Sequence, residues 1–408
     1  MRAKASCFLC IGLLFGATIA EVQAGTLTIR FDELADYAEA HSPRSKIIKY
    51  EFDRTRAERD EELQWSNPEL SFYRDNVDQS EESQVTLGKR FEAPWAYFKK
   101  RSSWNDRLTS AKLQQEQSGL DHLVALKTGY VRLQLFSEYL LRLGQLKEIL
   151  TDASHVATSK FSEGHLSGVE EHLIQMSVIS LNASYLTARQ EQRETMGKWR
   201  AETGFSADDR LILETKVTYK SIELRPSSHY VTLIETQPGL QAKAALQQAF
   251  SKRAAAERAA FIPSLYLYIG QKKISPDFDG FMVGVSLSLP LLNRNGAVSR
   301  KYEIESAIAL NKAKLYRIHL TGYVQALVRS ISESKLSLAT EAAHFDEDME
   351  ALNNLLYTYE EGWMTLNELL NAIQIEVNGL KDYYNQFIRY YENIFALEAL
   401  TGEPLVSF

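Results

Sequence analysis

The sequence predicts a mainly α-helical fold with a small β part, in which one structural unit occurs twice. Residues 95–225 and 291–403 contain none of the nine prolines of the chain. Because a proline in a helix interior costs about 3 kcal/mol, such long stretches without proline favour long helices. Short segments with alternating apolar residues precede each stretch, and these favour β-hairpins.

Prolines and glycines of the first half recur in the second half at separations of 195 to 198 residues. The surrounding residues agree, since Phe161-Ser-Glu-Gly164 corresponds to Tyr359-Glu-Glu-Gly362. A common register over nearly the whole chain indicates a duplicated unit. The paired positions are Pro43 with Pro238, Pro68 with Pro263, Pro94 with Pro290, Gly164 with Gly362, and Gly204 with Gly402.

This register divides the chain into consecutive parts. In each repeat a helix comes first, a β-hairpin follows, and a long antiparallel helical hairpin ends the unit. The expected boundaries are residues 1–24 for a signal peptide, 25–204 for the first repeat with its β-hairpin at 68–93, 205–237 for an equatorial connector, and 238–408 for the second repeat with its β-hairpin at 263–290.

The first residues have the composition of a secretory signal peptide. Arg2 and Lys4 give a positive start, an apolar stretch from Cys7 to Ala20 follows, and Ala24 ends a small-residue cleavage site. An apolar stretch this short does not span a bilayer as a helix. Because both cysteines lie inside it, we expect a secreted chain without disulfides, thiolate metal sites or a cysteine nucleophile.

Composition and motifs argue against several function classes. The net charge is −7, and −8 once two cations and one anion leave with the signal peptide, so we expect no nucleic-acid partner. Phosphate-binding, dinucleotide-binding and serine-hydrolase motifs do not occur. His165 and His172 lack the further ligands of a zinc site, and we expect no cofactor, no metal and no enzymatic activity.

Beyond residue 24 no apolar stretch reaches the ~18 residues of a transmembrane helix, so a membrane would have to be crossed by strands.

The β-hairpin of the second repeat has the clearest alternation. Its first strand alternates aliphatic side chains with Ser, Tyr and Gly, which places Tyr266 and Tyr268 on the same side as Ser264. Its second strand alternates aliphatic side chains with Gly and Ser as far as Pro290. We expect the tyrosine side to face a lumen and the other side to contact lipid. The predicted lipid-facing residues are Val283, Val285, Leu287 and Leu289.

The helical arms are expected to pair as antiparallel coiled coils. From residue 366 to residue 394 apolar side chains recur at alternating spacings of four and three, which is the seam of a coiled coil. Gly164 and Gly362 allow the chain to reverse between the arms. Capping-box patterns start the returning helices, and these are Ser167 with Glu170 and Thr365 with Glu368.

Four strands cannot close a barrel within one chain. An open sheet edge in lipid leaves unpaired N–H and C=O groups that cost several kcal/mol each, and the smallest membrane barrels have roughly eight strands. If the strands lie in a membrane, three chains would supply 3 × 4 = 12 strands. The long helical hairpins would then continue the pore as a helical tube.

Together these motifs resemble those of the TolC-like outer-membrane factors, the channel proteins of bacterial efflux and secretion systems. The resemblance covers residues 25–408 and rests on the duplicated strand led by Pro68 and Pro263, the strand that runs into Pro290, and the duplicated aromatic-x-x-Gly tips. The stretch from Asn67 to Leu70 is more similar to the heavy-metal branch of this family than to the drug branch.

The resemblance implies a passive channel that catalyses nothing. It implies a homotrimer with a 12-stranded β-barrel in the outer membrane and an α-helical barrel in the periplasm. It further implies a periplasmic adaptor protein at the helical tips and an inner-membrane transporter, here expected to be proton-driven. The competing hypothesis is a periplasmic coiled-coil scaffold or adaptor that never enters a membrane.

The resemblance also assigns residues at the helical tips. In the family, acidic residues six positions past the tip glycine narrow the periplasmic entrance, and Glu170 and Glu368 occupy these positions. Three copies of each would form carboxylate rings that favour cations; alternatively, the two glutamates act only as helix caps. The expected adaptor-docking residues are Gly164, Leu166, Gly362 and Met364, for which turn geometry alone is the alternative.

Overall fold

The computed structural model describes residues 26–77, 80–259, 264–275, 278–288, 295–345 and 348–408. The predicted signal peptide at 1–24 and the predicted lipid-facing Leu289 lie outside the described residues. Within these ranges long helices predominate and the strands are few, which confirms the predicted fold class.

The first half contains the elements that the repeat predicts, preceded by a strand and a short helix that it does not predict. Helix α3 alone is 69 residues long, which corresponds to about 100 Å at 1.5 Å per residue. The elements are β1 (Thr26–Ile29), α1 (Leu34–His41), α2 (Pro43–Glu62), β2 (Glu69–Val77), β3 (Ser80–Phe91), α3 (Pro94–Ser162) and α4 (Gly168–Thr203).

The second half repeats this order. The intervening residues contain β4 (Arg210–Leu213), α5 (Ser227–Leu233) and the short 3-10 helix η1 (Ile234–Thr236). The following elements are α6 (Pro238–Ala259), β5 (Leu265–Ser275), β6 (Phe278–Leu287), α7 (Gly296–Phe345), α8 (Asp348–Glu360) and α9 (Leu366–Thr401). The described parts of the long arm that corresponds to α3 are α7 and α8, on either side of residues 346–347.

The helix ends follow local signals in the sequence. Helices α2, α3 and α6 each begin at a proline, whose fixed φ suits the first helical position. Ahead of α2, the hydroxyl of Ser42 accepts a hydrogen bond from the Arg44 N–H at 3.0 Å. Helices α4 and α9 end at Gly204 and Gly402, which have φ values of 87° and 71°. Glycine is favoured there because a Cβ would be strained in this left-handed region.

The two β-hairpins join into one antiparallel sheet with the strand order β2-β3-β5-β6. The joining pair is β3 and β5, in which Leu87 lies opposite Ile269. A second, two-stranded sheet pairs β1 with β4 in parallel, with Leu27 opposite Leu211. The sequence predicted the two hairpins but neither of these long-range pairings.

The core lies where α3, α7 and α9 pack together, and buried tyrosines fasten the connecting segment to it. The hydroxyl of Tyr130 in α3 accepts a hydrogen bond from the Thr215 N–H at 2.8 Å. In α9, the hydroxyl of Tyr391 donates to the Thr218 carbonyl at 2.6 Å, and that of Tyr390 donates to the Lys220 carbonyl at 2.8 Å. Burial raises the pKa of Tyr390 to about 12, which keeps its hydroxyl protonated as a donor.

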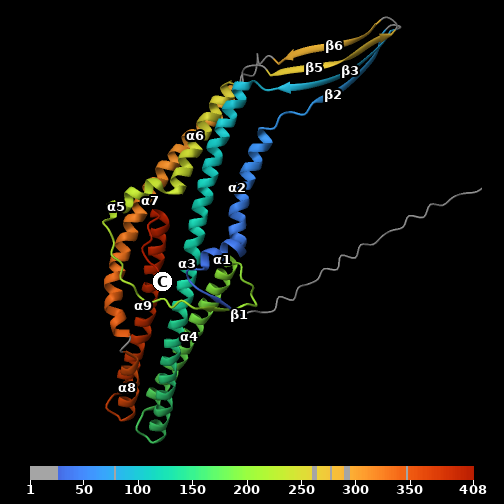
Figure 1. Cartoon of the computed structure of the whole chain (residues 1–408). Helices are drawn as coiled ribbons and strands as arrows, with labels where there is room; N and C mark the ends of the chain where they lie inside the picture. The colour runs from blue at the N-terminus through green and yellow to red at the C-terminus, as the bar shows by residue number, and fades with distance from the viewer. Residues whose placement is uncertain (1–25, 78–79, 260–263, 276–277, 289–294, 346–347) are drawn as a thin grey trace, which may run out of the picture.

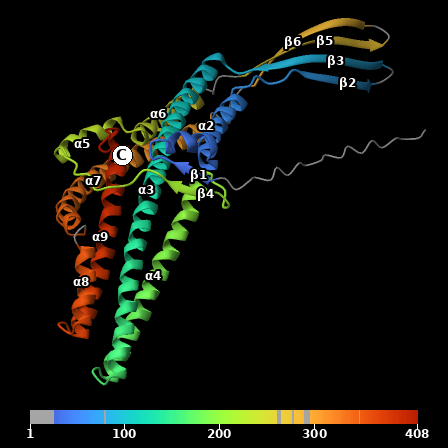
Figure 2. The ribbon, with the colours of Figure 1, turned by 60° about the horizontal axis from the view of Figure 1, so that its bottom comes forward.

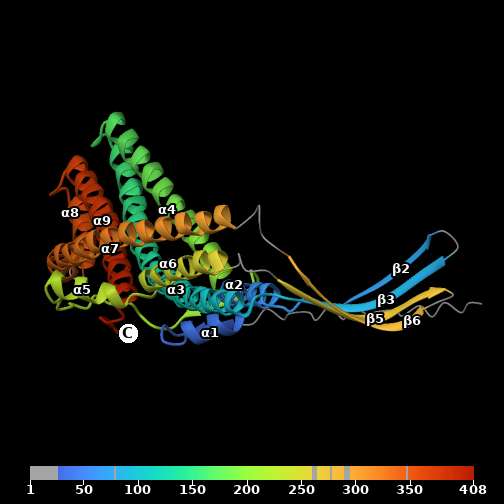
Figure 3. The same ribbon diagram turned by 90° about the horizontal axis from the view of Figure 1, so that it is seen from above.

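The molecule is elongated, with the sheet at one end and the turns between the helical arms at the other (Figure 1). Helix α3 runs from the sheet to these turns, and α4 and α9 lie beside its far half (Figure 2). Viewed from above, the sheet projects to one side of the helical body (Figure 3).

Candidate functional site

The four-stranded sheet has two chemically different faces. Because successive side chains of a strand point to opposite sides, residues paired across the strands form rows on one face. One row consists of Leu70, Leu87, Ile269 and Val283. Neighbouring rows on this face, which we call the aliphatic face, add the polar Gln271 and Lys89 and the apolar Phe72, Val85, Phe281, Leu267, Val285, Phe91, Leu265 and Leu287.

This aliphatic face is largely uncovered in the single chain. Phe281 and Leu70 are both 74% exposed, and the three described residues of the predicted lipid-facing set, Val283, Val285 and Leu287, are each more than half exposed. A contiguous apolar surface of this kind marks a site of contact with a protein or a lipid.

The opposite face carries tyrosines over glycines. A Cβ built on Gly88 would lie 2.2 Å from the hydroxyl oxygen of Tyr266, and one on Gly284 would lie 2.0 Å from Cζ of Tyr268. The two rings therefore lie directly over the backbone of neighbouring strands, where only glycine leaves room for them. Polar groups continue this face, among them the ion pair of Lys272 and Glu82 at 2.7 Å. The sequence correctly placed both tyrosines opposite the aliphatic residues.

The sheet ends in two open edges. Strands β2 and β6 are its outer strands, and each has a partner on one side only among the described strands. Their outer N–H and C=O groups can therefore pair with another strand. The aliphatic face, the tyrosine face and the two edges together form the first part of the candidate site.

The turns between the helical arms form the second part. Gly164 and Gly362 both have a φ of 79°, which confirms their predicted role in reversing the chain. Leu166 and Met364 are half-buried and pack against the core. Trp363 is 75% exposed, so it offers the largest apolar surface at these turns. The sequence analysis did not single out Trp363, although this aromatic residue directly follows the turn glycine Gly362.

The predicted capping boxes are present at both returning helices. The Glu170 carboxylate accepts hydrogen bonds from the Ser167 hydroxyl at 2.7 Å and from the Ser167 N–H at 2.9 Å. The Glu368 carboxylate accepts the equivalent bonds from Thr365 at 2.8 and 2.9 Å. These hydrogen bonds hold the pKa of both glutamates below the usual range, so both are charged at neutral pH.

A lysine connects the two turns. The Lys160 ammonium donates to the Tyr359 carbonyl at 2.6 Å and lies 4.5 Å from the centre of the Tyr359 ring. The turns of the two repeats are therefore held side by side.

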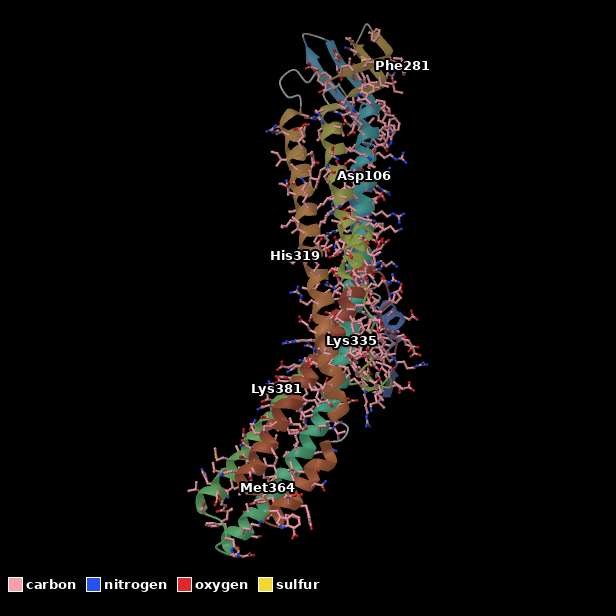
Figure 4. All side chains as sticks on the ribbon, turned by 90° about the vertical axis from the view of Figure 1, so that its left-hand side faces the viewer. Asp106, Phe281, His319, Lys335, Met364 and Lys381 are labelled. Carbon is pink, nitrogen blue, oxygen red and sulfur yellow. The ribbon has the colours of Figure 1, made fainter. Side chains whose placement is uncertain are left out.

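The two parts of the candidate site lie far apart. Figure 4 shows Phe281 on the sheet at one end of the molecule and Met364 near the other end. No cluster of three or more acidic or histidine side chains suited to a metal ion occurs among the described residues. In the same part of the chain, no helix combines the length and the apolar character of a membrane span.

Comparison with known proteins identifies the fold. No protein-family model and no curated protein matches the sequence. The outer-membrane channel CmeC of Campylobacter jejuni has a TM-score of 0.76 at 14% identity, with 92% of this chain and 86% of that chain covered. The outer membrane protein VceC of Vibrio cholerae has a TM-score of 0.75 at 14% identity over 91% and 96% of the two chains. The outer-membrane channel OprN has a TM-score of 0.74 at 13% identity over 91% and 89%.

At such low identity the similarity concerns the fold, and it extends over nearly the whole of each chain. The duplicated helical hairpins and the β-hairpins are thus arranged as in solved outer-membrane channels. The chain has the TolC-like fold that its motifs predicted.

Proposed function

We propose that this chain is the outer-membrane channel of a bacterial efflux pump and that it conducts its substrate passively as a homotrimer. The four-stranded sheet supports this most strongly, because it combines an exposed aliphatic face, a tyrosine and polar face, and two open edges. Membrane barrels alternate lipid-facing and lumen-facing residues in this way. A coiled-coil scaffold that stays in water is not favoured, since it has no use for the exposed aliphatic face.

Three chains would close the wall. Strands β2 and β6 run in opposite directions, so β6 of one chain would pair antiparallel with β2 of the next. Three sheets would then give a barrel of 3 × 4 = 12 strands without a free edge. Closure removes the cost of several kcal/mol for each edge group that would otherwise be unpaired in lipid.

The helical arms would form a second barrel in the periplasm. In the single chain, both α4 and α7 expose apolar side chains that a neighbouring chain would cover. Those of α4 are Val169, Leu173, Met176, Ile179 and Leu186, and those of α7 include Ile304, Ile308, Leu315 and Ile318.

The turns at the far end would dock a periplasmic adaptor protein. Gly164 and Gly362 would set the shape of the docking surface, Leu166 and Met364 would contribute its half-buried floor, and Trp363 would be its main exposed contact. An inner-membrane transporter, proton-driven in this proposal, would supply the energy through that adaptor.

Glu170 and Glu368 would contribute carboxylate rings at the periplasmic entrance in addition to capping their helices. Three copies of each charge around one axis would favour cations over anions. This fits a metal-cation cargo, which remains a prediction from the sequence.

Two neighbouring residues of β6 test the assignment of the faces. Val285→Arg places a charge on the aliphatic face, and burying this charge in lipid would cost about 2–4 kcal/mol per copy. The cost applies three times, because three copies share one barrel. We expect this variant to be missing from the outer-membrane fraction and to give no channels in planar bilayers. Ser286→Arg is the matched control, because it adds the same charge to the opposite face.

We expect Ser286→Arg to insert, to remain trimeric by native mass spectrometry, and to lower cation conductance. Equal insertion of the two variants would contradict the proposed faces. Wild-type protein that forms water-soluble monomers without channel activity would contradict the proposed function as a whole.

A further inference from the structure

The segment that leads from β3 into α3, at the end of the sheet that adjoins the helices, is rich in basic side chains. Residues 89–101 contain five basic residues and one acidic residue, a net charge of +4 in a chain whose net charge is −7. The same stretch contains four aromatic residues. Such a reversal of charge within one short segment points to an anionic partner.

Among the described residues, only one of these five cations, Lys100, has an ion-pair partner. Lys100 lies 3.3 Å from Glu62 and is thereby neutralised within the fold. Arg90 lies opposite Tyr266 and so belongs to the tyrosine face. Among the ion pairs of the described residues, by contrast, none involves Lys89 or Lys99. Lys99 is exposed and Lys89 half-buried, so both can reach a ligand outside the chain.

Aromatic contacts connect Lys89 to the aliphatic face. Lys89 and Phe91 share that face with Leu87, because they alternate along β3. The Lys89 ammonium lies 5.2 Å from the ring centre of Trp65 and 5.7 Å from that of Phe91. From there the ring contacts run from Trp65 to Tyr97 at 6.1 Å and from Tyr97 to Phe98 at 5.9 Å.

We call Trp65, Lys89, Phe91, Tyr97 and Phe98, together with Lys99, which follows Phe98 in α3, the junction cluster. Trp65 is 62% and Phe98 63% exposed, which is costly in water but favourable at the boundary of a membrane, where amphipathic rings lie at headgroup level. Lysine stems that run along apolar surface bring the ammonium groups to the same level. We therefore propose that the junction cluster binds the phosphate of anionic glycerophospholipids in the periplasmic leaflet.

This inference rests on the proposed membrane insertion of the sheet and adds a lipid preference to it. The periplasmic leaflet is the one concerned, because β3 leads directly into α3 at this end of the sheet. The positive charges of Lys89 and Lys99 favour phosphatidylglycerol over phosphatidylcholine, whose own ammonium cancels its phosphate charge.

The test compares full-length wild-type protein with the Lys89→Gln/Lys99→Gln double variant in detergent. Each is titrated with phosphatidylglycerol or phosphatidylcholine, and retained lipids are counted by native mass spectrometry. We expect wild type to prefer phosphatidylglycerol, and we expect the double variant to lose roughly tenfold in that preference. Lys312→Gln/Lys314→Gln, two exposed lysines of α7, removes the same charge away from the sheet and should behave as wild type.

Several results would overturn the inference. These are an unchanged preference in the double variant, equal binding of the two lipids by wild type, or competition by millimolar inorganic phosphate, which would identify a soluble anion as the ligand. Dissociation of the oligomer without a change in lipid preference would instead assign the junction cluster to contacts between chains. Wild-type channels that conduct but show no lipid preference would refute only this inference, whereas absence of channels would refute the proposed function.

Discussion

Helices α4 and α9 occupy equivalent positions in the two repeats and carry the same local signals, yet they are buried to very different extents. Both are 36 residues long, start with a capping box and end at a glycine with positive φ. Helix α9 nevertheless buries 13 residues and α4 only five. The signals that start and stop a helix therefore do not decide how much of it is covered.

The neighbours of each helix account for the difference. Helix α9 packs against both α3 and α7, and residues from the connecting segment and from the end of the chain cover its last turns. The ring of Phe408, for example, lies 5.0 Å from that of Tyr391. Helix α4 packs mainly against α3. In a single chain its outer apolar side chains are left without cover, which is why we assign them to contacts between chains.

The largest effect is expected from leucine truncations that compare the two helices directly. Leu380→Ala in α9 removes a side chain that is 1% exposed and should cost about 2–5 kcal/mol. Leu186→Ala in α4 removes one that is 53% exposed in the single chain and should cost less than about 1 kcal/mol within that chain.

Thermal unfolding of the full-length protein in detergent measures the first effect, and native mass spectrometry of the oligomer measures the second. We expect Leu380→Ala to lower the unfolding temperature strongly and Leu186→Ala mainly to weaken the trimer. A loss of chain stability in Leu186→Ala as large as in Leu380→Ala would show that the comparison is wrong.

The next effect concerns the two turns, which differ in the exposed side chain directly after the turn glycine. Trp363 in the second repeat corresponds to His165 in the first, at the common separation of 198 residues. Trp363→Ala should weaken adaptor binding by roughly 2 kcal/mol, or about thirtyfold, as for a tryptophan at the centre of an interface. His165→Ala should change it much less. The measurement is the affinity of the purified periplasmic adaptor for reconstituted channel, and equal effects of the two variants would remove the special role of Trp363.

A smaller effect is expected from the two carboxylates. Glu368→Gln and Glu170→Gln keep a hydrogen-bond acceptor for the cap but remove the charge, so each should reduce cation selectivity in planar bilayers with little change in stability. Hydrogen bonds from Thr365 and Ser167 lower the pKa of Glu368 and Glu170. Because their pKa is lowered, both glutamates stay charged through the pH range in which an ordinary glutamate titrates. They become neutral only at a pH below that range.

Cation selectivity should therefore survive moderate acidification and disappear only below the usual glutamate pKa. Reversal potentials measured across a salt gradient over a series of pH values would follow this. Selectivity that is the same in wild type and in both variants at every pH would reduce the two glutamates to helix caps.

The smallest effect is expected from removing the caps. Ser167→Ala and Thr365→Ala should each cost about 1 kcal/mol, because the N-terminal N–H groups of the helix lose their acceptor. Fraying should be greater in α4, since the first turn of α9 is held by the buried Leu366 and Leu369. Hydrogen exchange of the first two turns measures this directly, and equal exchange in both helices would argue against the role of burial.

The sequence predicted the strands of the sheet and their faces, but it did not predict which distant strands pair. Alternation along 264–270 and 283–287 identified the strands and their faces, because side-chain direction depends only on position within a strand. The pairing of Leu87 with Ile269 joins residues 182 positions apart, and no local pattern specifies such a partner. The same holds for the parallel pairing of β1 with β4, whose short strands have no turn signal between them.

By itself, the sequence determined where the helices begin and end and which side chains share a face. Those features depend on groups within a few residues of each other: the fixed φ of Pro43 or Pro94, the hydrogen bonds between Ser167 and Glu170, and the positive φ of Gly362. Only the tertiary structure decided that two hairpins form one sheet, that the connecting segment and the end of the chain cover α9, and that Lys89 lies near the rings of Trp65 and Phe91. These outcomes depend on which distant segments meet. Because the hydrophobic effect is non-directional, a single segment cannot specify which other segment will cover it.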